Sequence, residues 1–295
     1  MSGNHAPRLG ALGCPGCTPS RPQGPPSFPA WRAARIGIAC ERRSRRSAEL
    51  YDRARPVYPA QVFDDLVALA GLPEHGRLVE IGCGTGQATL PLAERGFEIV
   101  CVELGEQLSA VARRNLAAFP KVAIVNAAFE TWEPTDEPFD AVVAFTAFHW
   151  IDPDVRYERS WRLLRDDAAL AVVATQHVLA DDGDPFWADV QKAYDAITPG
   201  DDNRPPPHPD EVGDLLGEIE ASGYFRAVAV QRHLWDVSYT ADEYIAVLDT
   251  YSANRALDDD TRRSLYAEVH RRIEARPERK ARKTYLATLN VAQRL

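Results

Sequence analysis

Two adjacent segments organise the chain: Arg77-Leu-Val-Glu-Ile81 and, directly after it, Gly82-Cys-Gly-Thr-Gly86. The first has the apolar character of a buried strand, and an amphipathic segment follows from Gln87 to about Arg95. Glycines permit a sharp turn and leave the backbone open to a ligand, because no Cβ atom stands in the way. The pattern therefore predicts a strand, a ligand-binding loop and a helix in succession.

The alternation of short apolar runs with amphipathic segments continues toward the C-terminus. Further strands are expected at Glu98–Glu103, Val122–Val125, Phe139–Phe145, Ala168–Thr175, 226–237 and 282–291, with helices at Glu106–Ala118, Asp154–Leu164, 241–254 and 259–275. Strands that alternate with helices are typical of a parallel sheet that is buried on both faces. We therefore predict an α/β fold with a doubly wound, Rossmann-like, mostly parallel seven-stranded sheet, helices on both faces and a helical cap insertion.

The N-terminal part differs in composition from the rest of the chain. The first 30 residues contain seven prolines and five glycines and show no apolar periodicity. Such a segment buries too little apolar surface to offset the entropy of ordering, so we expect a disordered Pro/Gly/Arg-rich tail over 1–46. The expected folded domain comprises 47–295, with a core at 70–176, a cap insertion at about 180–225, and C-terminal helices and last strands at 226–295.

Charge and cysteine content narrow the possible functions of the 295-residue chain. The formal net charge is −9, and the first 48 residues hold eight arginines and only one acidic residue, so the remainder is strongly acidic. An acidic body repels phosphate backbones, which makes nucleic acid an unlikely partner and a small molecule a better one. The apolar runs are too short to span a membrane. Five cysteines form no disulfide framework, which favours the cytoplasm.

A metal site is not expected. Cys14 and Cys17 have the spacing of a zinc knuckle, but no second Cys/His pair follows at the distance that a zinc finger requires. Asp258-Asp-Asp260 is a charge cluster of the kind that suits a helix N-terminus. The oligomeric state is left open between a monomer and a homodimer.

Two acidic residues bear on which nucleotide the glycine loop binds. Glu103 ends the second strand 21 residues after Gly82, where a carboxylate can accept hydrogen bonds from both hydroxyls of a ribose. A dinucleotide fingerprint requires a sixth-position glycine, and Gln87 stands there instead. The spacing and Glu80 favour a ligand that has a ribose and an amino acid but no pyrophosphate.

The stretch Val79-Glu-Ile-Gly-Cys-Gly-Thr-Gly-Gln-Ala-Thr89 resembles motif I of the class I S-adenosylmethionine-dependent methyltransferases. The resemblance covers about 47–176 and is closest to the UbiE-like, small-molecule branch. The other segments that carry it are Tyr51–Pro59, Val102–Leu104, Ala128–Trp132 and Phe139–Trp150.

This resemblance implies S-adenosyl-L-methionine as the cofactor. The residues that it assigns to cofactor binding are Glu80, Gly82, Gly84, Gly86, Glu103, Phe129, Glu130, Phe145 and Thr146. Glu80 is expected near the amino group of the cofactor and Glu103 at the ribose. Phe129 and Glu130 are expected at adenine, and Phe145 and Thr146 near the methyl donor. Many relatives have Asp where Ala128 stands, so adenine recognition depends here on main-chain groups.

Three further residues have two interpretations each. Tyr51 and Arg55 are weaker candidates for closing over the cofactor, and otherwise belong to an ordinary helix N-terminus. His149 is a weak candidate for a general base, and otherwise fixes the loop after the fourth strand by packing. The catalytic residues are therefore not identified by the sequence.

The resemblance implies methyl transfer to a small molecule by in-line displacement, a reaction in which alignment of donor and acceptor matters most. The cap at 180–225 and the helices over 241–275 are expected to form a lid over the acceptor. Two alternatives stay open: a nucleic-acid or protein methyltransferase that uses the basic tail, and a non-catalytic protein that binds S-adenosylmethionine.

Overall fold

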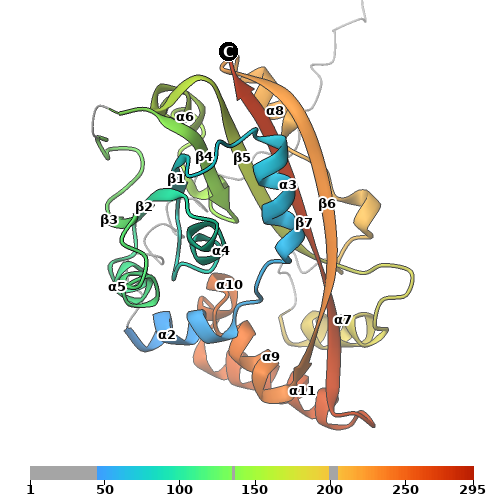
Figure 1. Ribbon diagram of the computed structural model, residues 1–295. Coiled ribbons are helices and arrows are strands. Elements are labelled where there is room, and N and C mark those ends of the chain that lie inside the picture. Colours follow the sequence, from blue (N-terminus) through green and yellow to red (C-terminus); the bar gives the residue numbers. More distant parts are fainter. Residues whose placement is uncertain (1–44, 135–136, 199–204) are drawn as a thin grey trace, which may run out of the picture.

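The computed structural model describes residues 45–134, 137–198 and 205–295 (Figure 1). The disordered tail expected over 1–46, which includes Cys14 and Cys17, lies almost wholly outside these ranges. Helix α2 (Arg45–Ala54) begins two residues before the domain boundary expected at residue 47.

Seven strands of the described ranges form one sheet in the order β3-β2-β1-β4-β5-β7-β6. Strand β7 runs antiparallel to both of its neighbours, whereas the pairs among β1 to β5 are parallel. The predicted Rossmann-like, mostly parallel sheet is confirmed. The strands are β1 (Arg77–Ile81), β2 (Glu98–Glu103), β3 (Val122–Asn126), β4 (Phe139–Phe145), β5 (Leu164–Val178), β6 (Phe225–Thr240) and β7 (Lys280–Arg294).

Helices cover both faces of the sheet because alternate residues of each strand point to opposite sides. Leu78 of β1 packs in one core with α3 and α4, whereas Val79 and Ile81 pack in a second core with α6 and α8. The helices of these layers are α3 (Ala60–Leu69), α4 (Thr89–Glu94), α5 (Glu106–Asn115), α6 (Arg156–Leu163) and α8 (Leu216–Ala221).

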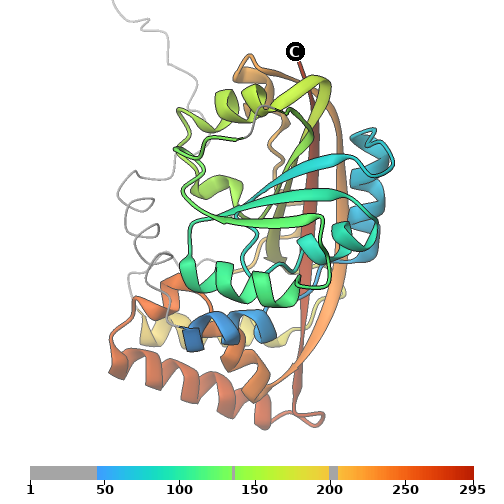
Figure 2. The same cartoon turned by 60° about the vertical axis from the view of Figure 1, so that its left-hand side comes forward.

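Three strands extend beyond the rest of the sheet. Strand β4 pairs with β5 as far as Phe145 and Val173, but β5 continues along β7 to the pair Val178 and Thr284. A further group of helices packs around these extensions and forms a separate layer at one end of the molecule (Figures 1 and 2). The layer contains α2, α7 (Phe186–Ile197), α9 (Ala241–Leu248), α10 (Ser252–Arg255) and α11 (Asp259–Glu274).

The region 180–225 does not form the single cap that the sequence suggests. Helix α7 buries Trp187 against α9 and α11, whereas α8 buries Ile219 in the core on the far side of the sheet. The two helices separate because their apolar residues fit different surfaces. The helix expected over 241–254 is also divided, because Tyr251 takes an extended conformation (φ −80°, ψ 129°) between α9 and α10. The short 3₁₀ helix Pro209–Glu211 lies between α7 and α8.

Asp184 connects the helical layer to the sheet. One carboxylate oxygen accepts from the Phe186 amide at 3.0 Å, at the start of α7. The other accepts from Arg276 Nη2 and from the Arg282 amide of β7, both at 2.9 Å. The side chain is 6% exposed, so these partners replace most of its hydration.

Asp184→Ala is expected to lower the free energy of unfolding by about 2–4 kcal/mol, because three donors lose a charged acceptor. Urea denaturation measures the change. The matched control is Asp181→Ala in the same loop, since Asp181 is fully exposed. The control is expected to stay within about 0.5 kcal/mol of the wild type. Equal effects of both substitutions would contradict the account of Asp184.

Candidate functional site

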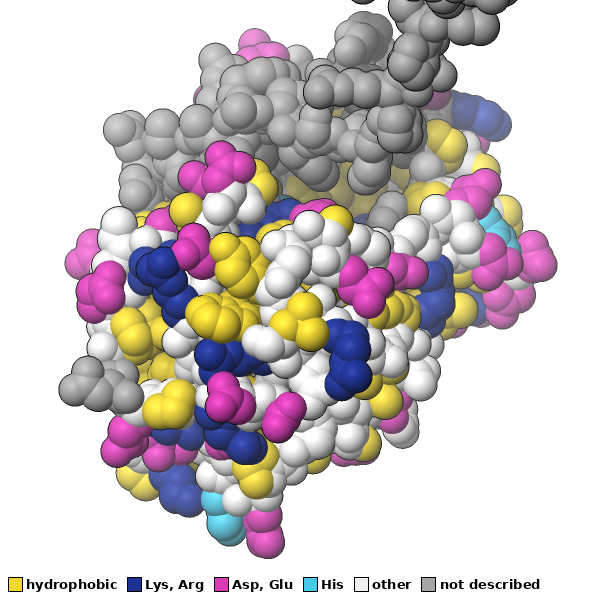
Figure 3. All heavy atoms as spheres, turned by 90° about the horizontal axis from the view of Figure 1, so that it is seen from above, with side chains coloured by type: hydrophobic (Ala, Val, Ile, Leu, Met, Phe, Trp, Pro, Cys, Tyr) yellow, Lys and Arg dark blue, Asp and Glu magenta, His cyan; other side chains and the backbone are white. Residues whose placement is uncertain are grey.

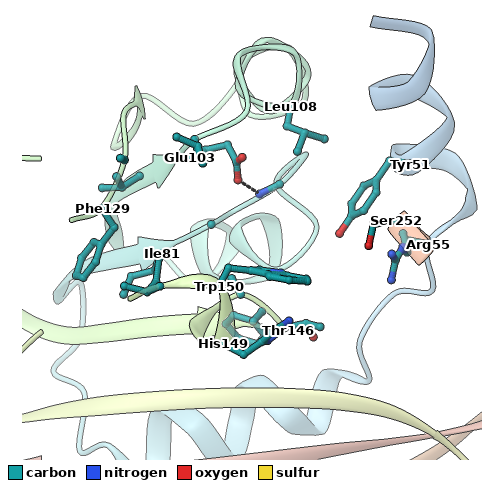
Figure 4. Close-up of a pocket in the computed structure, with 18 of the residues that line it drawn as sticks. Tyr51, Arg55, Ile81, Glu103, Leu108, Phe129, Thr146, His149, Trp150 and Ser252 are labelled. Atoms are coloured by element: carbon teal, nitrogen blue, oxygen red, sulfur yellow. Dashed lines mark hydrogen bonds between the residues drawn. The ribbon is translucent and has the colours of Figure 1, made fainter. Parts of the chain in front are cut away.

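A cavity of about 690 Å³ opens at the carboxyl ends of β1, β2 and β4, and is called here the first cavity (Figure 4). Open α/β sheets place their ligands at this edge, and the volume is in the usual range for small-molecule sites. The loops after β1, β2, β3 and β4 form one side. Figure 4 shows Tyr51, Arg55 and Ser252 facing Glu103 from the other side.

The glycine loop borders this cavity, and all three of its glycines have positive φ values. Gly82 and Gly84 have φ values of +65° and +60°, which L side chains rarely adopt. A Cβ atom on Gly82 would lie 2.7 Å from the Cβ atom of Ala147, and one on Gly84 would lie 3.6 Å from the Tyr51 ring. Both glycines line the cavity. Gly86 does not, because it packs against Leu116.

Glu103 is held in a defined orientation at the end of β2. Its Oε2 accepts from the Gly84 amide at 2.9 Å, and its Oε1 accepts from the Gly105 amide at 2.7 Å. These bonds stabilise a carboxylate that is only 4% exposed. A carboxylate oxygen accepts more than one hydrogen bond, so such a group suits the two hydroxyls of a ribose.

Glu80 lies below the glycine loop and is not among the residues that line the first cavity. Burial raises the pKa of its carboxyl to about 7, and a hydrogen bond with Thr89 opposes this shift. The side chain is 1% exposed and also approaches Cys101 Sγ. Its contact with the cofactor's amino group stays a prediction.

The residues expected at adenine lie together on the cavity wall. Phe129 is 2% exposed and has the Arg159 guanidinium 5.8 Å from its ring centre. Glu130 accepts from the Asp152 amide at 3.3 Å. Ala128 lines the same wall, so no carboxylate stands at that position.

Phe145 and Thr146 reach the cavity at the end of β4. Thr146 has a φ of +53°, a costly conformation for a β-branched residue, and such strain often occurs at functional sites. A hydrogen bond of 2.9 Å joins its Oγ1 to the Tyr58 hydroxyl. This hydrogen bond holds the Thr146 hydroxyl in place where Thr146 lines the first cavity.

His149 also lines the first cavity, on the 3₁₀ helix Phe148–Trp150. Burial, and then the charge of Arg156, lowers the pKa of its imidazole to about 4. The ring is therefore neutral at pH 7 and is a weak base. It also packs on Trp150, at 4.3 Å between ring centres, so both interpretations from the sequence are compatible with its position.

A second cavity of about 340 Å³ adjoins the first. Tyr51, Arg55, Thr146 and Tyr251 line both, so these four side chains form the boundary between the cavities. The Arg55 guanidinium stacks between the rings of Tyr51 and Tyr251, at 4.9 and 4.5 Å. The sequence predicted positions for Tyr51 and Arg55 beside the cofactor loop.

Several lining residues were not predicted individually, although they lie in the 241–275 region that was expected to form a lid. Tyr251, Ser252, Ala253, Arg255 and Ala256 line the first cavity but come from the C-terminal half of the chain. No local motif marks them, because only the packing of α10 beside α2 brings them to the site. Within the three described ranges, no cluster of three or more His, Cys, Asp or Glu side chains could hold a metal ion.

Comparisons with known proteins agree with this geometry. Residues 78–167 match the family described as methyltransferase domain. This segment is a methyltransferase domain. The resemblance to class I S-adenosylmethionine-dependent methyltransferases is thereby confirmed, and S-adenosylmethionine is the cofactor of that class. The UbiE-like branch stays a prediction.

An uncharacterised methyltransferase of Mycobacterium bovis is 33% identical over 123 residues, which cover 42% of this chain and 48% of the relative. Trans-aconitate 2-methyltransferase of Variovorax paradoxus is 32% identical over 117 residues, which cover 39% of this chain and 43% of the relative. The chain thus spans less than half the length of these relatives. The solved structure of a candidate type II methyltransferase from Anaeromyxobacter dehalogenans has a TM-score of 0.58 and 25% identity, covering 81% of this chain and 97% of the other.

Glu80 makes the stability of the protein depend on pH. Its folded-state pKa of about 7 exceeds the ordinary value of 4.5, so its contribution is fully present below pH 4.5 and is lost as the pH rises through 7. Glu80→Gln cannot titrate. The unfolding free energy of the variant relative to the wild type is therefore expected to rise by about 3 kcal/mol between pH 4.5 and 8.

Urea denaturation of both proteins at several pH values measures this difference. Comparing the two proteins at each pH removes the contributions of all other titrating groups. Parallel pH profiles would contradict the raised pKa of Glu80.

Proposed function

We propose that the chain is an S-adenosylmethionine-dependent methyltransferase that transfers a methyl group to a small-molecule acceptor. The observation that carries the proposal is the position of Glu103. Its carboxylate is fixed by the Gly84 and Gly105 amides inside the first cavity of a methyltransferase domain.

The residues of the first cavity fit the proposed cofactor. Glu103 accepts the ribose hydroxyls, and the bare backbone of Gly82 and Gly84 leaves room for the ribose and the methionine part. Phe129 and Glu130 lie where the adenine is expected. The bound cofactor supplies an activated methyl group on a positively charged sulfur.

The role of the protein in such a displacement is alignment and the exclusion of water. Thr146 stands at the boundary of the two cavities, where a donor in the first cavity and an acceptor in the second would meet. Tyr51, Arg55 and Tyr251 complete this boundary from α2 and from the segment before α10. They serve to position the acceptor and to shield the reacting atoms.

The second cavity supports a small acceptor, since about 340 Å³ is enough for a compact molecule. The relative from V. paradoxus is named as a methyltransferase that acts on trans-aconitate, which is also a small molecule. On the face shown in Figure 3, acidic and basic side chains are interspersed and form no continuous basic surface that would favour nucleic acid. None of the described helices is long and apolar enough to cross a membrane. A cytoplasmic location stays a prediction.

Gly84→Val is expected to abolish cofactor binding, because its side chain enters the space between the loop and Tyr51 and φ at this position is +60°. The matched control is Gly217→Val, since a Cβ atom on Gly217 would meet no atom within 4 Å and φ there lies outside the left-handed region. Thermal unfolding with S-adenosylmethionine, S-adenosylhomocysteine or NAD measures binding. At about 100 times Kd a ligand stabilises the native state by about 2.7 kcal/mol.

The wild type and Gly217→Val are expected to unfold at a higher temperature with both sulfur nucleosides and at an unchanged temperature with NAD. Gly84→Val is expected to respond to none of them. A response to NAD alone would contradict the proposal, as would equal responses of the two glycine variants. Binding without release of S-adenosylhomocysteine on any acceptor would favour a non-catalytic binding protein.

A further inference from the structure

The second cavity contains an unusual buried cation. The chain has four lysines, and Lys121, Lys192 and Lys280 are all exposed. Lys283 of β7 is only 3% exposed and lines the second cavity. Burial of an ammonium group is costly unless an anion or strong acceptors compensate for its lost hydration, so this position calls for a physical reason.

Aromatic rings surround the Lys283 ammonium. Its Nζ lies between 5.0 and 5.5 Å from the ring centres of Trp187, Tyr244, Tyr251 and Tyr285. It donates to the Tyr244 hydroxyl at 3.4 Å. Among the residues that the structure describes, no Asp or Glu forms an ion pair with Lys283. The rings and the Tyr251 hydroxyl stabilise the cation in part, without a carboxylate from the described residues beside it.

Arg55 brings a second cation to the same cavity. Its Nη2 donates to the carbonyl of Thr250 at 3.5 Å, and its Nε is buried without a hydrogen-bond partner in the described part of the chain. No described carboxylate forms an ion pair with it either. Two basic side chains thus line a cavity whose described lining residues include no Asp or Glu.

Two further polar nitrogen atoms in the cavity wall have no partner in the described part of the chain. His177, Trp235 and Tyr285 stand side by side on β5, β6 and β7, since Tyr285 pairs with both of the others. His177 Nε2 and Trp235 Nε1 are buried and have no hydrogen-bond partner among the described residues. Burial, and then the charge of Lys283, lowers the pKa of His177 to about 2, so this imidazole is neutral. Buried polar groups of this kind are usually satisfied by a ligand or water.

The electrostatics of the cavity favour a negative group. Burial lowers the pKa of Lys283, and the neighbouring Tyr251 hydroxyl opposes this shift. Burial raises the pKa of Tyr251, but the charges of Lys283 and Arg55 outweigh burial and lower it. An anion between the two cations would be stabilised by the same charges.

We infer that the second cavity binds the carboxylate of a small organic acid, with Lys283 and Arg55 as its recognition residues, and that this acid is the methyl acceptor. The inference rests on the proposed function, since it names the substrate class of that site. Arg55 offers the planar donors that suit a carboxylate, and Lys283 offers a second charge. The aromatic walls suit the carbon skeleton of an organic acid.

A carboxylate fits this cavity better than a phosphate does. Phosphate sites are commonly built from the amides of a helix N-terminus or a glycine loop. The second cavity is instead lined mainly by side chains of β5, β6, β7 and the α2 region, and no glycine is among them. Because Thr146 and Tyr251 also line the first cavity, an acid anchored here lies directly beside the expected methyl donor.

Lys283→Met tests the inference on the full chain saturated with S-adenosylhomocysteine. The probes are acetate and benzoate, their uncharged counterparts acetamide and benzamide, and inorganic phosphate. At least one carboxylate is expected to raise the unfolding temperature of the wild type with a saturable concentration dependence. The amides are expected to have no effect.

Lys283→Met is expected to lose the carboxylate response and to unfold at the same temperature as the wild type or higher, because an uncompensated buried charge is removed. Lys280→Met, on the same strand but exposed, is the control and is expected to keep the response. Arg55→Gln provides a second variant, with carboxylate affinity reduced at least about tenfold by loss of a charge-assisted hydrogen bond.

Three results overturn the inference: no response of the wild type to either carboxylate, equal responses to the acids and amides, or a larger response to phosphate. Retention of the carboxylate response in both cavity variants overturns it as well. The response to S-adenosylhomocysteine is recorded separately in every protein. Its absence from the wild type contradicts the proposed function, and the carboxylate probes then test the second cavity on the protein alone.

Discussion

The Gly84 amide donates a hydrogen bond to Glu103, and this contact joins the loop after β1 to the end of β2. The parallel register of the two strands, in which Ile81 lies beside Val102, brings both groups to the same edge of the sheet. Gly82 and Gly84 must then remain without side chains, and the carboxylate must be held by main-chain donors. The shape and the polarity of the first cavity both follow from these two requirements.

The second cavity depends on a different feature, the length of β5, β6 and β7. These strands continue past the end of β4 and carry His177, Trp235, Lys283 and Tyr285 into the helical layer. Helices α2 and α10 then cover the boundary between the two cavities. The common class I sheet thus provides one cavity, and the strand extensions of this chain provide the other beside it.

Much of this organisation could be predicted from the sequence. The bounds of β1, β2 and β4 agree with the prediction, because each is a mainly apolar run bounded by glycine or polar residues. Strand β5 is longer than predicted, since its polar residues, including Arg165 and Gln176, interrupt the apolar pattern. Strand alternation also places Glu80 on the same side of the sheet as Leu78, and its contact with the cofactor stays a prediction.

The boundary between the cavities could not be predicted, because its parts lie far apart in the chain. Tyr251 follows Arg55 by almost two hundred residues, and no sequence motif indicates that the two side chains lie together. Lys283 lies in a strand whose apolar pattern gives no sign of a buried charge. Strand β7 lies antiparallel between β5 and β6, and this position places the lysine near the glycine loop.

A crystal structure of the chain with S-adenosylhomocysteine tests the central claim most directly. The account predicts the ribose hydroxyls within hydrogen-bond distance of the Glu103 carboxylate and the sulfur beside Thr146, facing the second cavity. A nucleoside bound outside the first cavity would contradict it. So would a sulfur atom directed away from the boundary formed by Tyr51, Arg55, Thr146 and Tyr251.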